Sequence, residues 1–408
     1  LNAYTLTSSN YPFAASAVYT SPTTPGTQTV SNPYDTLSSP TPGAGATPAA
    51  PGAGNPSNVT AYSVANPLPS ETMYQWNVDN GIELWKNAGL ELQYLGTHSI
   101  HLNTNLYPNQ PTPGVGNQAL TVQQRRPNQT FGQIRVADNI ATAAYEGLTT
   151  VLRQRLSHGF SGNLSYTWAH ALAESEDANS SGTCMEQFNC KLDWGNASND
   201  IRHKAVFSFV YSLPTFNRSN FLVQEAFGGW QVNGLVSVQS GTPMNITLGS
   251  TDWANVGVPQ AAVGEEQRPN YVHTPRYNCS KQSLLKEAYG THTVSCIDTT
   301  AYAAPTKYTY GNLHRYDLHG PGSWTNNLSL FKNFKIHEQV NLQLRMEAFN
   351  ALNHTNLGTP SNIGFNVNAV PGNPTAGTLA DSSGTNAFGY PTTSGAGRTV
   401  QFAGKINF

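Results

Sequence analysis

The stretch Arg398-Thr399-Val400-Gln401-Phe402-Ala403-Gly404-Lys405-Ile406-Asn407-Phe408 decides the fold that this sequence predicts. Apolar and polar side chains alternate along it, and the apolar set shares one face: Val400, Phe402, Ile406 and Phe408. Such period-two alternation indicates a β-strand. In a soluble protein, an amphipathic final strand leaves an apolar sheet edge that invites aggregation, whereas a closed barrel in lipid needs such a strand. The stretch therefore predicts a barrel strand.

The composition agrees with many strands joined by polar loops. Only 11% of the 408 residues are charged, while 36 Gly and 26 Pro supply turns and 10% of the residues are aromatic. A disordered chain would lack the aromatic residues. The net charge of -2 gives no support for nucleic-acid binding. An apolar run long enough for a transmembrane helix is absent, which leaves open a membrane barrel, whose strands are half polar.

The same alternation recurs along the chain and predicts nine strands. They lie at residues 74–84, 90–94, 148–156, 160–172, 203–213, 229–240, 324–334, 340–352 and 398–408. Turn residues such as Asn87 and the group Ser157-His158-Gly159 separate neighbouring strands. The sequence therefore predicts an all-β, antiparallel transmembrane barrel.

The connections between the predicted strands are alternately short and long. Short ones lie near residues 86–89, 157–159, 214–227 and 335–338, and long ones begin at Gly96, at Ala173, at Gly241 and after Leu352. Short turns at one rim and long loops at the other are typical of outer-membrane barrels, whereas a soluble sandwich or propeller has short loops at both ends. If the last strand ends in the periplasm, every long loop lies outside the cell.

The predicted organisation has two parts. Residues 1–72 are rich in Pro, Gly and Ser and are expected to be an extracellular loop or linker. Residues 73–408 are expected to form the C-terminal portion of a barrel. Because single-chain bacterial barrels have an even number of strands, nine strands predict that at least one more lies upstream and that the chain is a piece of a longer protein.

Four cysteines lie in loop-like sequence, and their spacing favours pairing Cys184 with Cys190 and Cys279 with Cys296. Disulfides suit an oxidising location outside the cytoplasm, although four cysteines allow three connectivities. Zinc binding is the competing interpretation, but neither pair has the CxxC spacing or a close histidine.

Aromatic residues on the predicted strands are candidates for the girdles that flank a barrel's lipid-facing band. The candidates are Trp76, Tyr94, Tyr166, Trp168, Trp230 and Trp324. The alternative is ordinary aromatic packing in a sandwich core. On the opposite face, Arg153, Arg155, Arg345 and Glu347 would line the lumen, where they could form salt bridges or contact a plug.

Other groups of polar residues give weaker signals. Glu174, Glu176 and Asp177, with Asp193 and Asp200, form an acidic loop whose clustered oxygen ligands leave calcium binding as an alternative. Their spacing matches neither an EF-hand nor an RTX loop, so we expect a solvated loop. The pairs His98 with His101 and His314 with His319 leave metal ligation as a minority interpretation. No catalytic motif and no cofactor-binding fingerprint is present in the sequence. The sequence therefore predicts no enzyme, no bound metal and no cofactor.

Several segments resemble one family: the large Oar-like, TonB-dependent-receptor-type outer-membrane proteins common in Acidobacteria. The matches include Tyr166-Thr167-Trp168-Ala169-His170, Asp200-Ile201-Arg202-His203-Lys204, Gln239-Ser240-Gly241-Thr242-Pro243 and Arg345-Met346-Glu347-Ala348-Phe349-Asn350-Ala351-Leu352-Asn353-His354, with shorter ones at 94–96, 156–159, 229–232, 320–322 and 328–334. They occur in the family's order over residues 73–408. The resemblance implies the C-terminal portion of a barrel of about twenty-two strands. The family's signal peptide, carboxypeptidase-regulatory-like domain and plug are absent from the sequence.

The resemblance also implies partners and a function. The intact protein is expected in the outer membrane, taking up a small molecule, saccharide or peptide with energy from the TonB complex through its plug. Its terminal strand, including Phe408, would be read by the outer-membrane assembly machinery, so deleting Phe408 is expected to impair insertion. Two alternatives remain: a surface protein or adhesin that does not transport, and a secreted β-rich glycan-binding protein.

Overall fold

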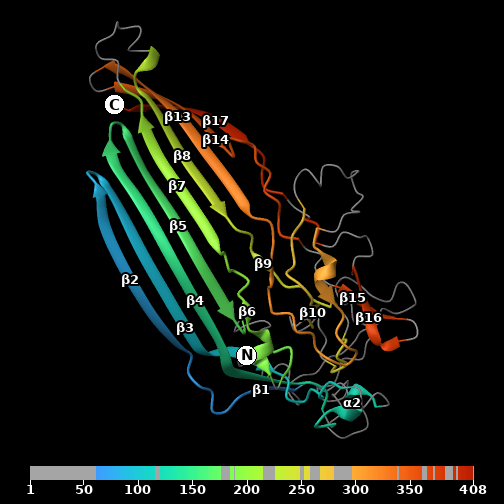
Figure 1. Cartoon of the computed structure of the whole chain (residues 1–408). Coiled ribbons are helices and arrows are strands. Elements are labelled where there is room, and N and C mark those ends of the chain that lie inside the picture. Colours follow the sequence, from blue (N-terminus) through green and yellow to red (C-terminus); the bar gives the residue numbers. More distant parts are fainter. Residues whose placement is uncertain are drawn as a thin grey trace, which may run out of the picture.

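A computed structural model describes residues 61–114, 120–129, 131–175, 184–187, 189–214, 226–248, 252–257, 267–279, 296–337, 340–360, 365–370, 373–381, 389–391 and 394–407. Within these residues, nine long strands lie side by side in one antiparallel sheet, in chain order (Figure 1). They are β2 (Thr72–Trp85), β3 (Ala88–Leu106), β4 (Ile134–Ser157), β5 (Phe160–Ala173), β7 (His203–Ser212), β8 (Trp230–Gln239), β13 (Ser323–His337), β14 (Val340–Phe349) and β17 (Thr399–Asn407). The predicted nine strands and the antiparallel all-β class are confirmed.

Two short strands join the margins of this sheet. β1 (Ala61–Val64) runs parallel to the start of β4, and β6 (Gly195–Asn196) pairs with the end of β5. β1 lies in the segment 1–72 that the sequence predicts to be a loop or linker, most of which falls outside the described residues. The sheet ends in β2 on one side and β17 on the other.

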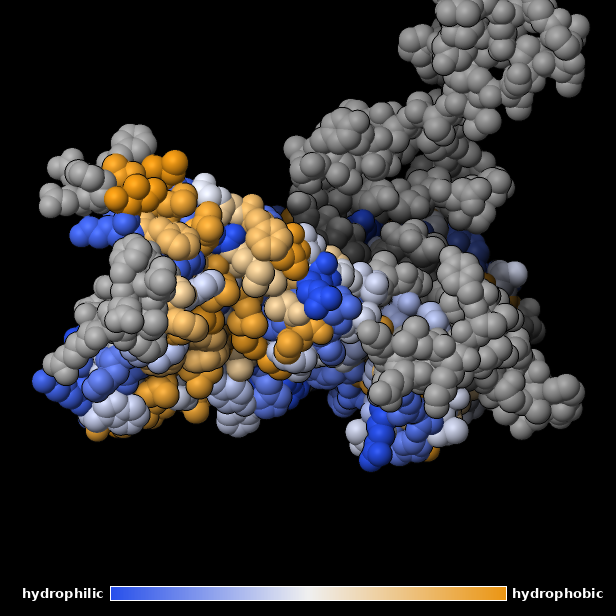
Figure 2. All heavy atoms as spheres, turned by 90° about the horizontal axis from the view of Figure 1, so that it is seen from above, coloured by the Kyte–Doolittle hydropathy of each residue, from blue (hydrophilic) through white to orange (hydrophobic). Residues whose placement is uncertain are grey.

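The register of the strands separates two faces. Cross-strand partners share a face, as in the row Val78, Tyr94, Leu148, Trp168 and the row Val232, Leu330, Met346, Phe402. We call this the apolar face. Its side chains are unusually open, with Phe402 77% and Val78 65% exposed. Figure 2, which looks at the end of the molecule that carries the short turns, shows hydrophobic residues gathered in a broad area over its strand-built part.

The opposite face, which we call the polar face, carries the alternate residues of the same strands. One of its rows is Asn233, Ser329, Glu347 and Gln401, and another contains Arg153, Asn163 and Ser208. A shift of register by one residue would exchange the two faces, so the alternation in the sequence fixes the register.

The tight turns use residues that tolerate positive φ. Asn87 (φ 71°) joins β2 to β3, and His158 (φ 50°) with Gly159 (φ 82°) joins β4 to β5. A Cβ on Gly159 would lie 2.3 Å from the carbonyl oxygen of Ser212, so the close approach of β7 requires glycine as well. Both turns lie where the sequence predicts them.

Two strands are much longer than the sequence predicts. β3 has 19 residues and β4 has 24, against the expected segments 90–94 and 148–156. A membrane-spanning strand needs only about 9–11 residues. The additional pairs, such as Asn103 with Asn139 and Leu106 with Val136, lie at the end with the long connections. The long loop expected from Gly96 is therefore partly a continued hairpin.

The four long connections gather at one end of the sheet (Figure 1). We refer to the described residues of segments 107–133, 174–202, 240–322 and 350–398 as the loop cap. Its elements are α2 (Val122–Arg125), η3 (Cys190–Asp193), β9 (Pro243–Met244), β10 (Asn270–Tyr271), η4 (Thr299–Ala301), β11 (Tyr302–Ala303), β12 (Leu318–His319), β15 (Phe365–Val370) and β16 (Asn373–Asp381). In the described part of the chain, no helix is long and apolar enough to cross a membrane.

The loop cap has a hydrophobic core of its own. Residues from two long connections pack together with almost no exposure: Met244, Ile246, Ile297, Ala301, Tyr302, Leu313, Leu318 and Phe365. Short antiparallel pairs, β9 with β12 and β10 with β11, surround this core. The connection after Gly241 is therefore a folded unit rather than the open loop that its length predicts.

Candidate functional site

The polar face of the sheet contains a hollow of about 800 Å³, which crosses β4, β5, β7, β8, β13 and β14. Serine and asparagine side chains line part of it, and Arg153, Arg155 and Glu347 also border it. Apolar side chains contribute the rest of the lining: Val210, Leu235, Phe331 and Phe349. Two buried amide atoms at the hollow, Oδ1 of Asn163 and Nδ2 of Asn233, have no hydrogen-bond partner among the described residues. A buried polar atom without a partner costs free energy, so an occupant that carries a polar group next to Asn163 and Asn233 would be favoured there.

The charged residues predicted for this face are tied to their neighbours. Arg153 Nη2 lies 3.3 Å from Glu91 Oε2. Arg345 Nε donates to Gln343 Oε1 at 2.5 Å, and its guanidinium lies 4.8 Å from the ring centroid of Phe331. These contacts orient the cations along the face, although the Arg153 side chain is still 65% exposed.

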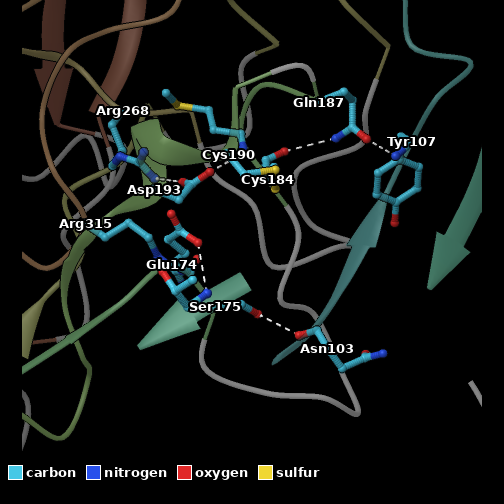
Figure 3. The surroundings of a disulfide bond; sticks show 12 residues. Asn103, Tyr107, Glu174, Ser175, Cys184, Gln187, Cys190, Asp193, Arg268 and Arg315 are labelled. Carbon is cyan, nitrogen blue, oxygen red and sulfur yellow. Dashed lines mark hydrogen bonds and ion pairs between the residues drawn. A yellow bond between two sulfur atoms is a disulfide. The ribbon is translucent and has the colours of Figure 1, made fainter. Parts of the chain in front are cut away.

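A second part of the site is the disulfide Cys184–Cys190 in the loop cap (Figure 3). Asp193 ends η3, the short helix that begins at Cys190. Its Oδ2 accepts a 2.7 Å hydrogen bond from the Met185 backbone N–H. Its Oδ1 accepts a 2.8 Å bond from Arg268, an ion pair in which both side chains are 3% exposed. Arg268 comes from the next long connection, so this buried pair joins two connections.

Arg268 makes two further bonds. Its Nε donates to the Leu313 carbonyl oxygen and its Nη2 to the Leu192 carbonyl oxygen, both at 2.9 Å. Each of the three guanidinium nitrogens of Arg268 therefore donates a hydrogen bond, as a buried arginine requires. This arrangement corrects the prediction of a solvated acidic loop, because Asp193 is buried against a cation that lies 75 residues away in the sequence.

Two more contacts connect this region to the sheet (Figure 3). Arg315 Nη1 donates to the Glu174 carbonyl oxygen at 2.6 Å, and the Ser175 hydroxyl donates to the Asn103 carbonyl oxygen at 3.3 Å. The Tyr107 backbone N–H also donates to the side chain of Gln187. The ring of Cys184–Cys190 is therefore fastened to the extended β3–β4 hairpin.

A second buried carboxylate, Asp200, lies where β7 begins and is 1% exposed. It accepts bonds from the Ala171 N–H at 2.7 Å and from Arg202 Nε at 2.5 Å, and His319 Nε2 lies 3.4 Å away. Arg202 Nη2 is also 2.7 Å from His170 Nε2. Asp200 therefore joins the sheet to β12 of the loop cap and is a further exception to the solvated acidic loop.

The disulfide Cys279–Cys296 joins two segments of the same long connection near the core of the loop cap. Tyr277, next to it, packs against that core, and burial together with Tyr390 raises its pKa to about 12. Burial also raises the pKa of Asp317, against the opposing influence of His314 and His319. These shifts reflect desolvation in a folded unit.

The structure places the six aromatic candidates on the apolar face. Trp76 lies near the loop-cap end of β2, and its ring covers Gly96, where a Cβ would lie 2.2 Å from the indole Nε1. Trp168 and Trp324 lie toward the same end of their strands, with Tyr166, whose hydroxyl is 2.9 Å from His203 Nδ1, and Tyr94. Trp230 lies at the short-turn end of β8.

The terminal strand β17 pairs with β14 over nine residue pairs. Val400, Phe402 and Ile406 point to the apolar face and are 45%, 77% and 59% exposed. Phe408 lies outside the described residues. Within the described chain, no three His, Cys, Asp or Glu side chains gather in a way that could hold a metal ion.

The sequence does not single out Arg268 and Arg315, the cations that organise the loop cap. Each is an isolated arginine in a long connection, and its partner lies in another connection. No local pattern reports such pairing.

Comparisons with known proteins give one family and several distant structures. A family model described as an outer membrane beta barrel domain matches residues 1–401. No curated protein matches the chain. The outer membrane transporter YddB from Escherichia coli is similar over 86% of this chain and 34% of its own, at 10% identity and a TM-score of 0.41. The pyoverdine outer membrane receptor FpvA from Pseudomonas aeruginosa, bound to pyoverdine, is similar over 83% and 30%, at 9% identity and 0.36. This chain spans about a third of the length of these structures.

Proposed function

Because this chain belongs to the outer membrane beta barrel domain family, we propose that it supplies wall and extracellular surface to a TonB-dependent-receptor-type transporter. As a family member, the chain is an antiparallel β-barrel protein of the outer membrane. The apolar face then meets lipid and the polar face lines the interior. This location overturns the alternative of a secreted glycan-binding protein.

We propose the orientation in which the short turns face the periplasm and the loop cap faces the exterior. The contrast between the turns at Asn87 and Gly159 and the long connections at the other end supports it. Both disulfides then lie in an oxidising location. The aromatic residues at the two ends of the apolar face would form the girdles at the membrane boundaries.

The observation that carries the proposed function is the folded loop cap at one end of the sheet whose polar face contains the hollow. Binding residues in barrels lie on loops that a rigid scaffold positions. Here the buried pair Asp193–Arg268 and the core around Met244 hold those loops in one arrangement. We propose that the loop cap captures a small molecule, saccharide or peptide, and that the ligand passes along the polar face without being chemically changed.

The resemblance of residues 73–408 to Oar-like proteins supports the finer proposal. It suggests a plug and a regulatory-like domain elsewhere in the intact protein, with the TonB complex as the energy-supplying partner. It also suggests that the terminal strand, with Phe402 and Ile406 on its lipid-facing side, is recognised by the outer-membrane assembly machinery.

A depletion assay tests the proposed function. Cells with and without the gene are incubated in a defined mixture of ferric siderophores, oligosaccharides, peptides and cobalamin, and the medium is followed by mass spectrometry. We expect one class to be depleted only by cells that carry the protein, and a protonophore that removes the energy supply of TonB to abolish the depletion. Unchanged depletion without the gene would contradict transport.

The folded loop cap also favours a second function, surface binding without transport. A cap held by two disulfides and a buried ion pair presents a fixed surface to other surfaces or glycans. In the same assay, this function predicts binding to whole cells that requires the protein and persists in the presence of the protonophore.

A further inference from the structure

The apolar face carries a groove of about 680 Å³ near the short turns. Its floor is made by β4, β5 and β7 through Leu152, Phe160, Leu164 and Phe207. The turn between β2 and β3 forms its side. The floor of this groove lies on the opposite face of the sheet from the hollow, because Leu152, Phe160, Leu164 and Phe207 occupy positions of the apolar alternation. Gln154 and Gly162 border both.

The groove exists because small and flat groups occupy its centre. Gly162 lies in the floor, and a Cβ there would come within 2.9 Å of the Phe160 ring. The ring centroids of Phe207 and Phe209 lie 5.2 Å apart, and the two ring planes meet at 24°. The rings therefore stack along the sheet instead of filling the groove. The floor is therefore apolar and open.

The side of the groove is fixed by a hydrogen bond. Trp85 Nε1 donates to Gln154 Oε1 at 3.0 Å, across β3, and the Asn87 carbonyl oxygen accepts a 2.7 Å bond from the Arg155 N–H. These bonds hold the turn that carries Lys86 over the floor. The indole has its apolar body against the groove and its N–H satisfied, as is typical of a membrane-interface tryptophan.

The rim of the groove is polar and cationic. Lys86 lies on it with His158, whose Nδ1 is 3.0 Å from the Ser157 hydroxyl. No carboxylate is among the lining residues that the structure describes. The nearby Glu83 and Glu91 line a second, smaller cavity of about 460 Å³, together with Arg153 and Arg155. The rim is therefore complementary to a negative charge.

We propose that this groove binds one phospholipid with an anionic headgroup, in the leaflet on the short-turn side. The acyl chain lies on the floor of Leu152, Leu164 and Phe207, and Lys86 contacts the phosphate. An apolar groove that faces lipid excludes water, and a cation at the membrane boundary selects an anionic headgroup. The proposal rests on the proposed orientation, which makes this leaflet the periplasmic one.

The test uses the protein with its native sequence, purified from outer membranes in mild detergent. Native mass spectrometry measures retention of phosphatidylglycerol, of phosphatidylcholine with the same acyl chains, and of lipopolysaccharide. We expect phosphatidylglycerol to be retained in preference to the other two. Lys86→Gln should lower its retention about fivefold, the effect of one cation at a membrane surface. Leu164→Trp should fill the groove and lower retention of any phospholipid.

A matched control is Lys335→Gln, which removes an exposed lysine of β13 from the polar face at the same end of the sheet. It should leave retention unchanged. Heat-modifiable migration of each variant shows that the barrel is folded. Equal retention by the Lys86 and Lys335 variants, equal retention of the two phospholipids, or retention of lipopolysaccharide alone would overturn the proposal. The two proposals can fail separately. If the purified protein retains phosphatidylglycerol as expected but cells that carry the protein deplete no ligand in the uptake assay, the proposed transport function fails and the lipid site stands.

Discussion

The strand wall and the loop cap of this protein bury opposite kinds of surface. In the wall, apolar side chains such as Phe402 and Val78 are mostly exposed, and cross-strand hydrogen bonds maintain the register. In the loop cap, residues such as Leu248 and Ile297 are 0% and 1% exposed, and a buried ion pair and two disulfides join distant parts of the chain. The difference reflects two solvents, because lipid solvates an apolar side chain and water does not.

The largest effect is expected where the loop cap depends on a buried charge pair. Arg268→Met leaves Asp193 buried without its cation, which costs about 3–5 kcal/mol. The cap should become sensitive to protease and exchange amide hydrogens near residues 184–202 while the wall keeps its heat-modifiable migration. The control is Arg153→Met in the exposed pair with Glu91, for which about 1 kcal/mol or less is expected. Equal protease resistance of both variants would mean that the pair does not hold the cap.

A charge on the apolar face tests the other half of the comparison. Leu344 is 45% exposed, so in water its replacement by arginine would be nearly neutral. In lipid, Leu344→Arg should destabilise the barrel by about 2–4 kcal/mol if the side chain lies near the bilayer midplane. Asn341→Arg, on the polar face of the same strand, is the control. Urea-dependent unfolding in detergent micelles or lipid vesicles measures both, and equal stability of the two variants would contradict a lipid-facing Leu344.

The two disulfides should stabilise the loop cap to different extents. Cys279–Cys296 closes a separation of 17 residues and Cys184–Cys190 one of 6. From loop-closure entropy, removal should cost about 3 kcal/mol for the first and about 2 kcal/mol for the second. Double-serine variants at each pair, compared by thermal unfolding of the cap, measure this order. A larger loss for the shorter ring would show that its contacts to β3, and not chain entropy, dominate.

The smallest effect is expected from Asp317, whose pKa is raised by burial. A raised folded pKa means that the folded cap prefers the protonated acid, so this contribution to stability is present at low pH and is lost as the pH rises through the folded value. Asp317→Asn should therefore make the cap more protease-resistant at neutral pH and have no effect below pH of about 4, the ordinary range of the group. A stabilisation of equal size at both pH values would exclude titration as the cause.

The wall could be predicted from the sequence because its physics is local. Alternation along 398–408 or 160–172 reports which side of a strand meets lipid, and turn residues such as Asn87 and Gly159 mark where the chain reverses. The loop cap could not be predicted in the same way. The partners Asp193 and Arg268 are 75 residues apart, and the core residues Met244 and Phe365 belong to different connections. Such contacts leave no period in the sequence.

The uneven length of the strands has a consequence for what the cell's surroundings meet first. β4 spans about 79 Å at 3.3 Å per residue and β7 only about 33 Å. In the proposed orientation, the β3–β4 hairpin therefore projects past the headgroup layer on one side of the molecule. Antibodies, phages and extracellular proteases would meet this ridge, and natural sequence variation should concentrate near the described end of the hairpin, at residues 103–106 and 134–139.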